Sequence, residues 1–231
     1  MQIKFSIILP CYNEYKNLKL LIPEILNIFK NKSFEILVID DNSSDQTTTK
    51  LKNNFNKSSR IKYILRKKNR SLGLSIKDGL IASKGKVVIV MDTDFNHKPT
   101  DLKKMLHLYE INSFDMICGS RFIKGGFSST TFRHFTSLIF NYFLNFITKG
   151  KLTDNLSGFF IIKKNLISKI LNKTFYGYGE YYIRLLFYLQ KKKITIKEIP
   201  VKYGARKYGT SKSKLLAMFF LYTYHALKLV K

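Results

Sequence analysis

In the first half of the chain, short apolar runs alternate with longer segments in which apolar residues recur at helical spacing. The runs cover residues 2–9, 34–39, 61–65, 87–91 and 114–118, and the most regular helical segments cover 13–29 and 73–83. The runs are apolar at consecutive positions, which is typical of parallel strands with helices on both faces. We therefore predict an α/β fold with a mostly parallel, Rossmann-like sheet flanked by helices.

The second half of the chain carries two long aromatic segments. Residues 132–148 place eight aromatic or aliphatic side chains on one helical stripe, and residues 215–230 form a second apolar helix that includes His225 and Lys228. A transmembrane helix needs about 20 apolar residues, and neither segment meets that requirement cleanly. Two interpretations follow for each helix: it packs on the sheet, or it lies in a membrane interface with basic residues at the lipid headgroups.

The composition adds a strong positive charge. Lys and Arg number 41 against 15 Asp and Glu, which gives a formal net charge of +26. Such a charge favours polyanionic partners, namely nucleic acid, an anionic membrane surface or phosphorylated substrates. The abundance of Lys, Asn and Ile and the low number of Ala are also typical of an AT-rich genome, which is a second explanation for the charge. An apolar content of 45% excludes a disordered chain.

Two features bear on the cellular compartment. Cys11 and Cys118 are too few and too far apart for a disulfide scaffold or a zinc cluster, so we expect a reducing compartment. The first residues lack the basic region, the long apolar region and the cleavage site of a secretory leader, and we expect none.

Acidic and polar residues follow three of the predicted strands, each time directly after the last apolar residue. These turns are Pro10-Cys11-Tyr12-Asn13-Glu14, Asp40-Asp41-Asn42-Ser43-Ser44-Asp45 and Asp92-Thr93-Asp94-Phe95-Asn96. Because the carboxyl ends of parallel strands share one edge of a sheet, we expect the three turns to converge on one cleft. Asp92 and Asp94 could hold Mg²⁺ or Mn²⁺ through oxygen and leave coordination sites for a diphosphate. The alternative is that they cap the following helix.

Six motifs in chain order carry a resemblance to a known family. They are P-x-Y-N-E at 10–14, D-D-x-S-x-D at 40–45, D-x-D with H-x-P at 92–99, G-S-R at 119–121, Asp154 with S-G-F at 157–159, and Arg206 with Y-G-x-S-K at 208–212. With these motifs the chain resembles the family 2 glycosyltransferases, and among them the dolichyl-phosphate (polyprenyl-phosphate) mannosyltransferases. The resemblance runs from Ile7 to Lys212. It implies the A-type glycosyltransferase fold, with a catalytic domain at 1–212 and a C-terminal helix at 213–231, packed or membrane-interfacial.

The resemblance also implies roles for individual residues. The pocket for the donor nucleotide would be lined by Pro10, Tyr12, Glu14, Ile39, Asp41, Asp92 and Ser211. The metal ion would be held by Asp92, Asp94 and Asn96, with His97 shaping the loop behind it. Arg121 and Arg133 would face the acceptor phosphate, because Arg suits planar two-point contacts with phosphate. Arg206, Ser211 and Lys212 would lie on a loop that closes over donor and acceptor.

The chain departs from the family pattern at three places. Asn96 stands where some members have Gln, and Phe160 stands where Arg is common. The carboxylate in Gly177-Tyr178-Gly179-Glu180 is offset from its usual position. These departures concern the third metal ligand and the acceptor side of the site.

The roles together imply an inverting, metal-dependent transfer of a hexose to a polyprenyl or dolichyl phosphate, with mannose from GDP-mannose favoured. A lipid phosphate is already an anionic nucleophile, so it needs alignment and charge neutralisation more than a strong base. We expect a peripheral protein on the cytoplasmic face of an anionic membrane, with the helix at 132–148 and the C-terminal helix in the interface. A single membrane span at 215–230 is the alternative, at the cost of placing His225 and Lys228 in or near hydrocarbon.

Other functions stay open. One is a family 2 transferase that uses a UDP-sugar (glucose or N-acetylhexosamine) or a saccharide acceptor. A basic nucleic-acid binder would explain the charge, but it leaves the three acidic turns unexplained, and the sequence shows no helix-turn-helix, zinc or RNA-recognition signature. We therefore expect no nucleic acid partner.

Overall fold

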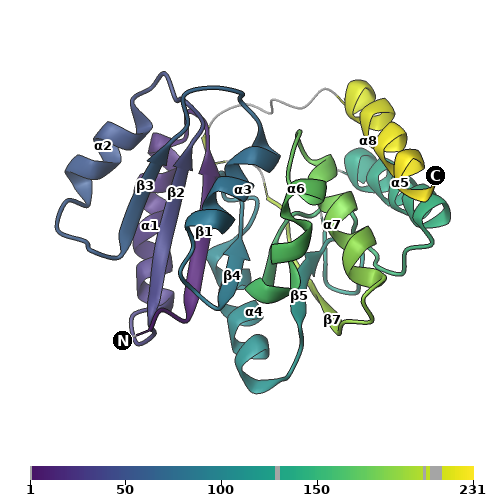
Figure 1. The fold of residues 1–231 in the computed structure, drawn as a ribbon, viewed down its shortest axis with the longest axis horizontal. Helices are drawn as coiled ribbons and strands as arrows, with labels where there is room; N and C mark the ends of the chain where they lie inside the picture. The colour runs from purple at the N-terminus through teal and green to yellow at the C-terminus, as the bar shows by residue number, and fades with distance from the viewer. Residues whose placement is uncertain (1, 128–130, 205–206, 209–214) are drawn as a thin grey trace.

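The computed structural model describes residues 2–127, 131–204, 207–208 and 215–231. Within these residues seven strands form one sheet, in the spatial order β3-β2-β1-β4-β6-β5-β7 (Figure 1). The strands are β1 (Phe5–Cys11), β2 (Phe34–Asp40), β3 (Ile61–Leu65), β4 (Val87–Val90), β5 (Met116–Ser120), β6 (Phe160–Lys163) and β7 (Ile196–Pro200). Neighbouring strands are parallel except that β6 runs antiparallel to β4 and β5. The predicted mostly parallel sheet is confirmed.

The sequence pattern does not reveal two of these strands. β6 has only four residues, a length at which an apolar run does not distinguish a strand from a buried turn. β7 pairs only with β5 in the strand order, so it lies at the edge of the sheet, and its Lys197 and Glu198 interrupt the apolar pattern. Edge strands commonly carry charged residues, which weakens their hydrophobic signal.

Helices cover both faces of the sheet. They are α1 (Tyr15–Ile28), α2 (Thr47–Asn54), α3 (Leu72–Ala82), α4 (Pro99–Ile111), α5 (Thr131–Thr148), α6 (Leu171–Thr174), α7 (Glu180–Gln190) and α8 (Leu215–Val230). Apolar side chains of α1, α2 and α4 pack on one face, and those of α3, α6 and α7 are associated with the other. In β1, Ile7 and Leu9 face the first layer and Ile8 faces the second, so consecutive strand residues are all buried.

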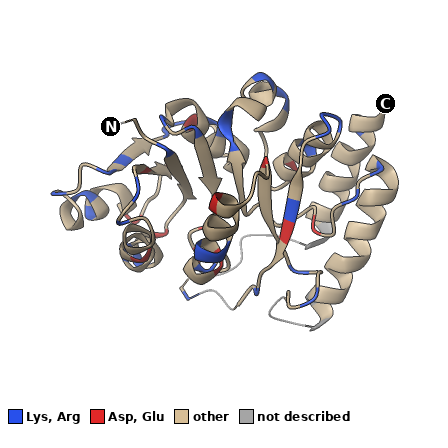
Figure 2. Cartoon of the chain, turned by 90° about the horizontal axis from the view of Figure 1, so that it is seen from below, with Lys and Arg blue, Asp and Glu red and all other residues tan. Residues whose placement is uncertain are grey.

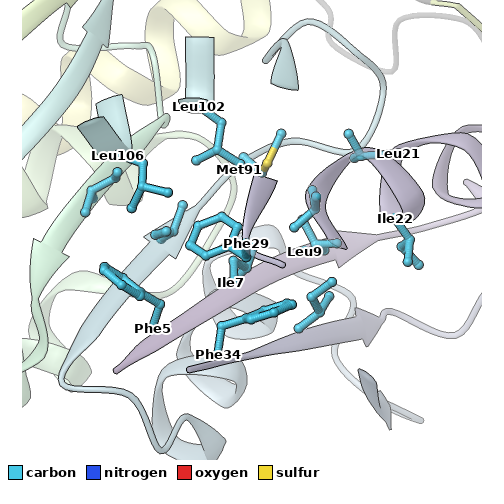
Figure 3. Packing of buried hydrophobic residues seen from close by; sticks show 14 of the residues in the cluster. Phe5, Ile7, Leu9, Leu21, Ile22, Phe29, Phe34, Met91, Leu102 and Leu106 are labelled. Atoms are coloured by element: carbon cyan, nitrogen blue, oxygen red, sulfur yellow. The ribbon is translucent and has the colours of Figure 1, made fainter. Parts of the chain in front are cut away.

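Three phenylalanines show how the first layer closes over the sheet. Phe29 follows α1 directly, and its ring packs against Phe5 of β1 and Phe34 of β2, with ring centroids 5.7 and 5.3 Å apart (Figure 3). On the same side, Leu102 and Leu106 of α4 are buried in the cluster. Burial of each such side chain contributes roughly 1.5–3 kcal/mol, which anchors the strands whose ends carry the polar turns.

The helices α5 and α8 lie beside each other at the C-terminal side of the molecule, next to α7 (Figure 1). Leu144 of α5, Ile183 of α7, and Tyr222 and Ala226 of α8 form a small buried cluster. In this cluster α5 and α8 pack on α7 and on each other. The cluster does not show the direct packing on the sheet that the first of the two interpretations expects. No helix within the described residues is long and apolar enough to span a membrane.

Candidate active site

A cavity of about 550 Å³ opens at the carboxyl ends of β1, β2 and β4. It is lined by Pro10, Cys11, Tyr12, Glu14, Asp41, Arg70, Ser71, Leu72, Ser75, Asp92, Thr93, Asp94 and Tyr178. The predicted convergence of the three polar turns on one cleft is confirmed. Among the described residues that line the cavity, four carry a carboxylate and Arg70 carries a positive charge. The volume of the cavity lies within the usual range for small-molecule sites.

The turns after β1 and β2 are held together by hydrogen bonds. Asn13 has a positive φ of 57°, and its side-chain oxygen accepts from the backbone N–H of Ser44 at 2.8 Å. Its own N–H donates to the Ser43 hydroxyl, also at 2.8 Å. Asp40 and Asp45 accept hydrogen bonds inside the second turn and at the start of α2. These two carboxylates build the turn, and Asp41 between them lines the cavity.

Asp41 is buried and held by two neighbouring groups. It forms an ion pair with Arg66, whose side chain is also buried, and it accepts the Ser71 backbone N–H at 2.7 Å. Arg66 in turn donates to Asp78 at 2.7 Å and to the Ser75 hydroxyl at 3.2 Å. The predicted pocket carboxylate is thus present at the cavity, with its orientation fixed by an arginine that the sequence motifs do not mark.

Ile39 is placed differently from the expectation that it lines the pocket. Its side chain is fully buried in the core layer beneath α3, where its Cγ1 would lie 3.2 Å from a Cβ atom at Gly79. The physical reason is the alternation of a strand: Asp40 and Ile39 point to opposite faces, and Ile39 takes the face that α3 covers. The side chain therefore belongs to the core and is not among the lining residues.

An aromatic residue and an arginine meet at the edge of the cavity. The Arg70 guanidinium carbon lies 3.7 Å from the centroid of the Tyr12 ring, a cation–π arrangement. Arg70 itself is exposed to solvent. Both residues line the cavity, so the pair forms part of its wall.

Asp92 and Asp94 follow β4 and both line the cavity. Asn96 donates to the Asp94 carboxylate twice, from its backbone N–H and from its side-chain amide, both at 3.0 Å. Asn96 therefore braces Asp94 here, and a part for it as a third metal ligand stays a prediction. The helix α4 begins after Lys98, which makes no side-chain cap hydrogen bond, and the alternative that Asp92 and Asp94 cap this helix stays a prediction.

His97 supports the Asp92 turn from inside the core. Its ring is fully buried and stacks on Phe159, with centroids 4.5 Å apart. The Asp92 backbone N–H donates to Nδ1 at 2.7 Å, so the ring proton lies on Nε2, which is 2.6 Å from the Tyr203 hydroxyl. Burial lowers the pKa of His97 to about 4, which keeps the ring neutral. This agrees with the expected role of His97 in shaping the loop.

Cys11 lines the same cavity without being a nucleophile. Burial raises the pKa of its thiol well above the usual value, and the carboxylates of Asp40 and Glu14 raise it further. Because the thiolate is the reactive form, a thiol held protonated in this way is inert.

Arg121, directly after β5, is bound to Asp154. Its Nε and Nη2 donate to the two carboxylate oxygens, each at 2.8 Å, and the Asp154 side chain is fully buried. The guanidinium also lies 4.9 Å from the centroid of the Tyr203 ring. The charge of Arg121 is thus compensated inside the protein, and contact with an acceptor phosphate stays a prediction.

Several predicted residues lie outside the described part of the chain. These are Arg206, Ser211 and Lys212, together with the side chain of Arg133, whose backbone belongs to the first turn of α5. The neighbouring Lys207 donates its backbone N–H to the Asp94 carbonyl at 3.5 Å, and the Asn17 amide donates to the Tyr208 carbonyl at 3.3 Å. The described flank of the late motif therefore lies beside the D-x-D turn.

Residues 6–171 match the model of a protein family described as Glycosyl transferase family 2. The match covers most of the chain and includes the three turns that line the cavity. The chain belongs to glycosyl transferase family 2.

Curated relatives of this family 2 chain include proteins named for lipid-phosphate substrates. A "Dolichol-phosphate mannosyltransferase" of Pyrococcus furiosus is 30% identical, over 99% of this chain and 64% of the relative. A "Dolichyl-phosphate beta-glucosyltransferase" of Dictyostelium discoideum is 26% identical, over 87% of this chain and 66% of the relative. A "Putative glycosyltransferase CsbB" of Bacillus subtilis is 32% identical, over 72% and 50%. The chain spans about half to two thirds of the length of these relatives.

Solved structures confirm the expected A-type glycosyltransferase fold. The glucosyl-3-phosphoglycerate synthase of Mycobacterium tuberculosis, crystallised with Mn²⁺, uridine diphosphate and glucosyl-3-phosphoglycerate, superposes with a TM-score of 0.74 over 99% of this chain and 80% of that chain, at 16% identity. A crystal of the same synthase with Mg²⁺ and uridine diphosphate gives 0.74 at 17% identity, over 99% of this chain and 79% of that chain. At this identity the likeness concerns the fold.

The family 2 site fits a divalent cation of the hard type. Asp92 and Asp94 offer carboxylate oxygens to one cavity, which are the ligands that Mg²⁺ and Mn²⁺ prefer. Among the described residues no group of three or more His, Cys, Asp or Glu forms a metal cluster. A two-carboxylate set of this kind takes its remaining ligands from water and substrate oxygens.

Sequence reasoning missed the part of the family 2 site that follows β3. Arg70, Ser71 and Ser75 line the cavity, and Arg66 holds Asp41 from behind. The signal was available, because Leu65 ends a parallel strand whose carboxyl end lies at the same edge of the sheet. Tyr178 could not be found in this way, since it reaches the cavity from the loop before α7.

Proposed function

We propose that this chain transfers a hexose from a nucleotide sugar to a polyprenyl or dolichyl phosphate, with inversion and with a divalent cation. The observation that carries the proposal is the acidic cavity at the carboxyl edge of the sheet, lined by Asp41, Asp92 and Asp94. Four carboxylates would repel a diphosphate unless a cation bridged the charges. The names of two curated relatives support dolichyl phosphate as the acceptor.

Each part of the site has a task in this proposal. Asp92 and Asp94 would hold Mg²⁺ or Mn²⁺, which supplies electrostatic stabilisation of the departing nucleoside diphosphate. Tyr12 and Arg70 offer a flat pair for the nucleotide base, and Asp41, fixed by Arg66, offers an acceptor for a base N–H. His97 and Asn96 keep the D-x-D turn in place before substrate arrives.

The carboxylates of the described cavity favour a phosphate acceptor over a hydroxyl acceptor. A sugar hydroxyl needs a general base, whereas a lipid phosphate is already charged. Asp41 is committed to Arg66, Glu14 accepts a hydrogen bond from the Asn17 amide, and Asp92 and Asp94 are assigned to the metal. The basic residues expected at the acceptor are Arg121, Arg133, Arg206 and Lys212. They would reduce the repulsion between the two anionic substrates and align the phosphate for in-line attack, which inverts the anomeric centre.

The donor has two candidates. The Pyrococcus relative, named a mannosyltransferase, favours mannose, for which GDP-mannose is the donor proposed here. The Dictyostelium relative, named a glucosyltransferase, favours glucose from a UDP-sugar. The alternative is therefore the same reaction with UDP-glucose, or with UDP-N-acetylglucosamine.

A donor panel tests the proposal. The protein is incubated with Mn²⁺, a short polyprenyl phosphate and radiolabelled GDP-mannose, UDP-glucose or UDP-N-acetylglucosamine, and labelled lipid is extracted. We expect label in lipid with one donor, none with EDTA, and none with the matching polyprenyl alcohol. Equal transfer to the alcohol would overturn the phosphate acceptor, and undiminished transfer in EDTA would overturn the cation.

We also propose that the protein lies peripherally on the cytoplasmic face of a membrane, since a polyprenyl tail stays in the bilayer. The helices α5 and α8 form an outer surface that is largely uncharged (Figure 2). On it Phe132, Tyr142, Phe146, Phe220 and Tyr224 are each at least 60% exposed. The net charge of +26 suits anionic headgroups around such an aromatic surface.

A further inference from the structure

The loop 175–179, between α6 and α7, carries Tyr178 into the cavity and is held to α3 by hydrogen bonds. The Gly177 carbonyl accepts from the Ser71 hydroxyl at 2.6 Å and from the Gly73 N–H at 3.0 Å. A Cβ atom on Gly73 would lie 2.5 Å from the Tyr176 carbonyl oxygen, so the close approach requires glycine there. Through Ser71, which lines the cavity, the loop becomes part of the wall of the site.

Two buried charged residues of α7, Glu180 and Arg184, form hydrogen bonds to the backbone of this loop and of the residue before it. Both oxygens of the Glu180 carboxylate accept the Tyr178 backbone N–H, each at 3.0 Å. Arg184 donates to the Thr174 carbonyl at 2.9 Å and to the Tyr176 carbonyl, and its guanidinium lies 3.6 Å from the centroid of the Tyr176 ring. The Glu180 and Arg184 side chains are only 2% and 1% exposed.

The helix α8 completes this cluster. His225 Nδ1 lies 3.2 Å from Arg184 Nη1, and its Nε2 lies 3.8 Å from a Glu180 oxygen. Because a guanidinium only donates, Nδ1 is the acceptor and the ring proton lies on Nε2, toward Glu180. Tyr222 lies one turn earlier on α8, and its hydroxyl contacts Gly179. A Cβ atom on Gly179 would lie 2.0 Å from this hydroxyl oxygen.

Burial of these charges has a cost that packing alone would not require. Apolar residues of similar volume commonly stabilise a helix interface as well as or better than a buried ion pair. The charged residues add directional hydrogen bonds that apolar residues could not make. Each of them contacts a backbone atom of residues 174–178 or another member of the set. The offset carboxylate Glu180 is thus used inside the protein, to hold the backbone of Tyr178.

We propose that Glu180, Arg184 and His225 are positioning residues that link α8 to the cavity and hold Tyr178 against the bound nucleotide sugar. The inference rests on the proposed function insofar as the cavity binds a nucleotide. Its distinctive claim is that a residue on α8, outside the cavity, sets the affinity for the donor through Tyr178.

A tryptophan reporter tests the claim, because the chain contains no tryptophan. Tyr178→Trp places a single indole in the cavity wall, and its emission and anisotropy are recorded before and during titration with GDP and Mn²⁺, and with UDP and Mn²⁺. Into this parent we introduce His225→Ala and His225→Asn, of which the Asn variant keeps a hydrogen-bond acceptor near the place of Nδ1. The matched control is Leu227→Ala, at an exposed position of α8.

We expect His225→Ala to shift the nucleotide-free emission to longer wavelength, to lower its anisotropy and to raise the nucleotide Kd about fivefold, the effect of one lost polar contact. His225→Asn restores most of each signal, and Leu227→Ala leaves all three near the parent. In the protein with Tyr178, the effects of Tyr178→Ala and His225→Ala on the donor KM should be non-additive, because His225 acts through Tyr178.

The possible failures are separable. The positioning role is overturned if His225→Ala leaves the emission and the nucleotide Kd unchanged. It is also overturned if the His225→Ala and His225→Asn variants change them equally. Additive effects of the two Ala substitutions overturn the route through Tyr178. If neither nucleotide binds the parent or the protein that retains Tyr178, the proposed function fails, while the nucleotide-free emission and anisotropy still decide whether His225 holds the loop. Thermal unfolding of each variant identifies any that does not fold.

Discussion

Asp92 and Asp94 are the residues on which the proposed chemistry depends most directly. Each offers a carboxylate to the cavity, and Asp→Asn removes the charge with little change in volume. We expect either substitution to lower kcat/KM by a factor of about 100 or more, a loss typical of removing one electrostatic element from an active site. The measurement is turnover with the active donor at saturating Mn²⁺.

The control for these variants is Glu110→Gln, which removes a surface carboxylate paired with Lys32. It should leave turnover unchanged, and all three variants should unfold at similar temperatures. Full activity of both Asp variants would remove the D-x-D turn from the mechanism.

Arg66 is the residue whose loss should affect folding and the site together. Arg66→Ala leaves Asp41 as a buried carboxylate without its ion pair. We expect the free energy of unfolding to fall by roughly 3 kcal/mol or more, as when one member of a buried pair is removed. Urea denaturation measures the loss. The control is Arg60→Ala, which removes an exposed arginine over the Phe34 ring and should lower the free energy of unfolding by less than about 1 kcal/mol. An equal loss in the Arg66 and Arg60 variants would contradict the importance of the buried ion pair.

Among the elements, Glu35 of β2 links β1, β3 and the loop before β4. Its carboxylate accepts from the Ser6 hydroxyl at 2.8 Å and from the Lys84 N–H at 2.5 Å, and it forms an ion pair with Lys62. Burial raises the pKa of Glu35, but the hydrogen bonds from Lys62, Lys84 and Ser6 outweigh it, so the net shift is downward.

A lowered pKa means that Glu35 stabilises the fold above the ordinary pKa of about 4.3, and that this stabilisation disappears as the pH falls through the lower folded-state value. Glu35→Gln should therefore reduce stability at pH 7 and flatten the fall in unfolding temperature between about pH 5 and pH 3. Differential scanning calorimetry across this range checks it. A slope in Glu35→Gln parallel to that of the parent would contradict the assignment.

The outer surface of α5 and α8 makes a prediction about lipid binding. Phe146 of α5 is 85% exposed on this surface, and burial of one Phe side chain contributes roughly 1.5–3 kcal/mol. Phe146→Ser should weaken co-sedimentation with anionic vesicles about tenfold. Ile111→Ser, at an equally apolar exposed position on α4, is the matched control and should bind as the parent does. Equal binding by both variants would place the lipid contact elsewhere.

At the scale of the whole molecule, the charge of +26 should govern membrane attachment. Each basic residue near an anionic surface contributes roughly 1 kcal/mol, and salt screens this attraction. We expect binding to anionic vesicles at low salt, release at high salt or in carbonate, and weaker binding to neutral vesicles. Retention through carbonate would indicate an integral attachment, and the absence of vesicle binding would reject the peripheral location.

Most of the fold was predictable because the relevant signals are local. Consecutive apolar residues in β1, β2 and β4 follow from burial on both faces, and the alternation with helices then implies a parallel sheet. The three polar turns follow, because parallel strands end at one edge. The strands β6 and β7 were missed, since their pairing partners lie far away in the chain and neither carries a strong local pattern.

Local sequence signals were enough for the parallel part of the sheet, the family and three carboxylates of the cavity, because spacing and strand ends place Asp41, Asp92 and Asp94 without knowledge of packing. The partners of these carboxylates depend on the tertiary structure. It paired Asp41 with Arg66, Arg121 with Asp154, and Glu180 with the loop that carries Tyr178. Such partners lie from 2 to 33 positions apart, and the direction of a side chain depends on which helix covers which face, a property that no local pattern encodes.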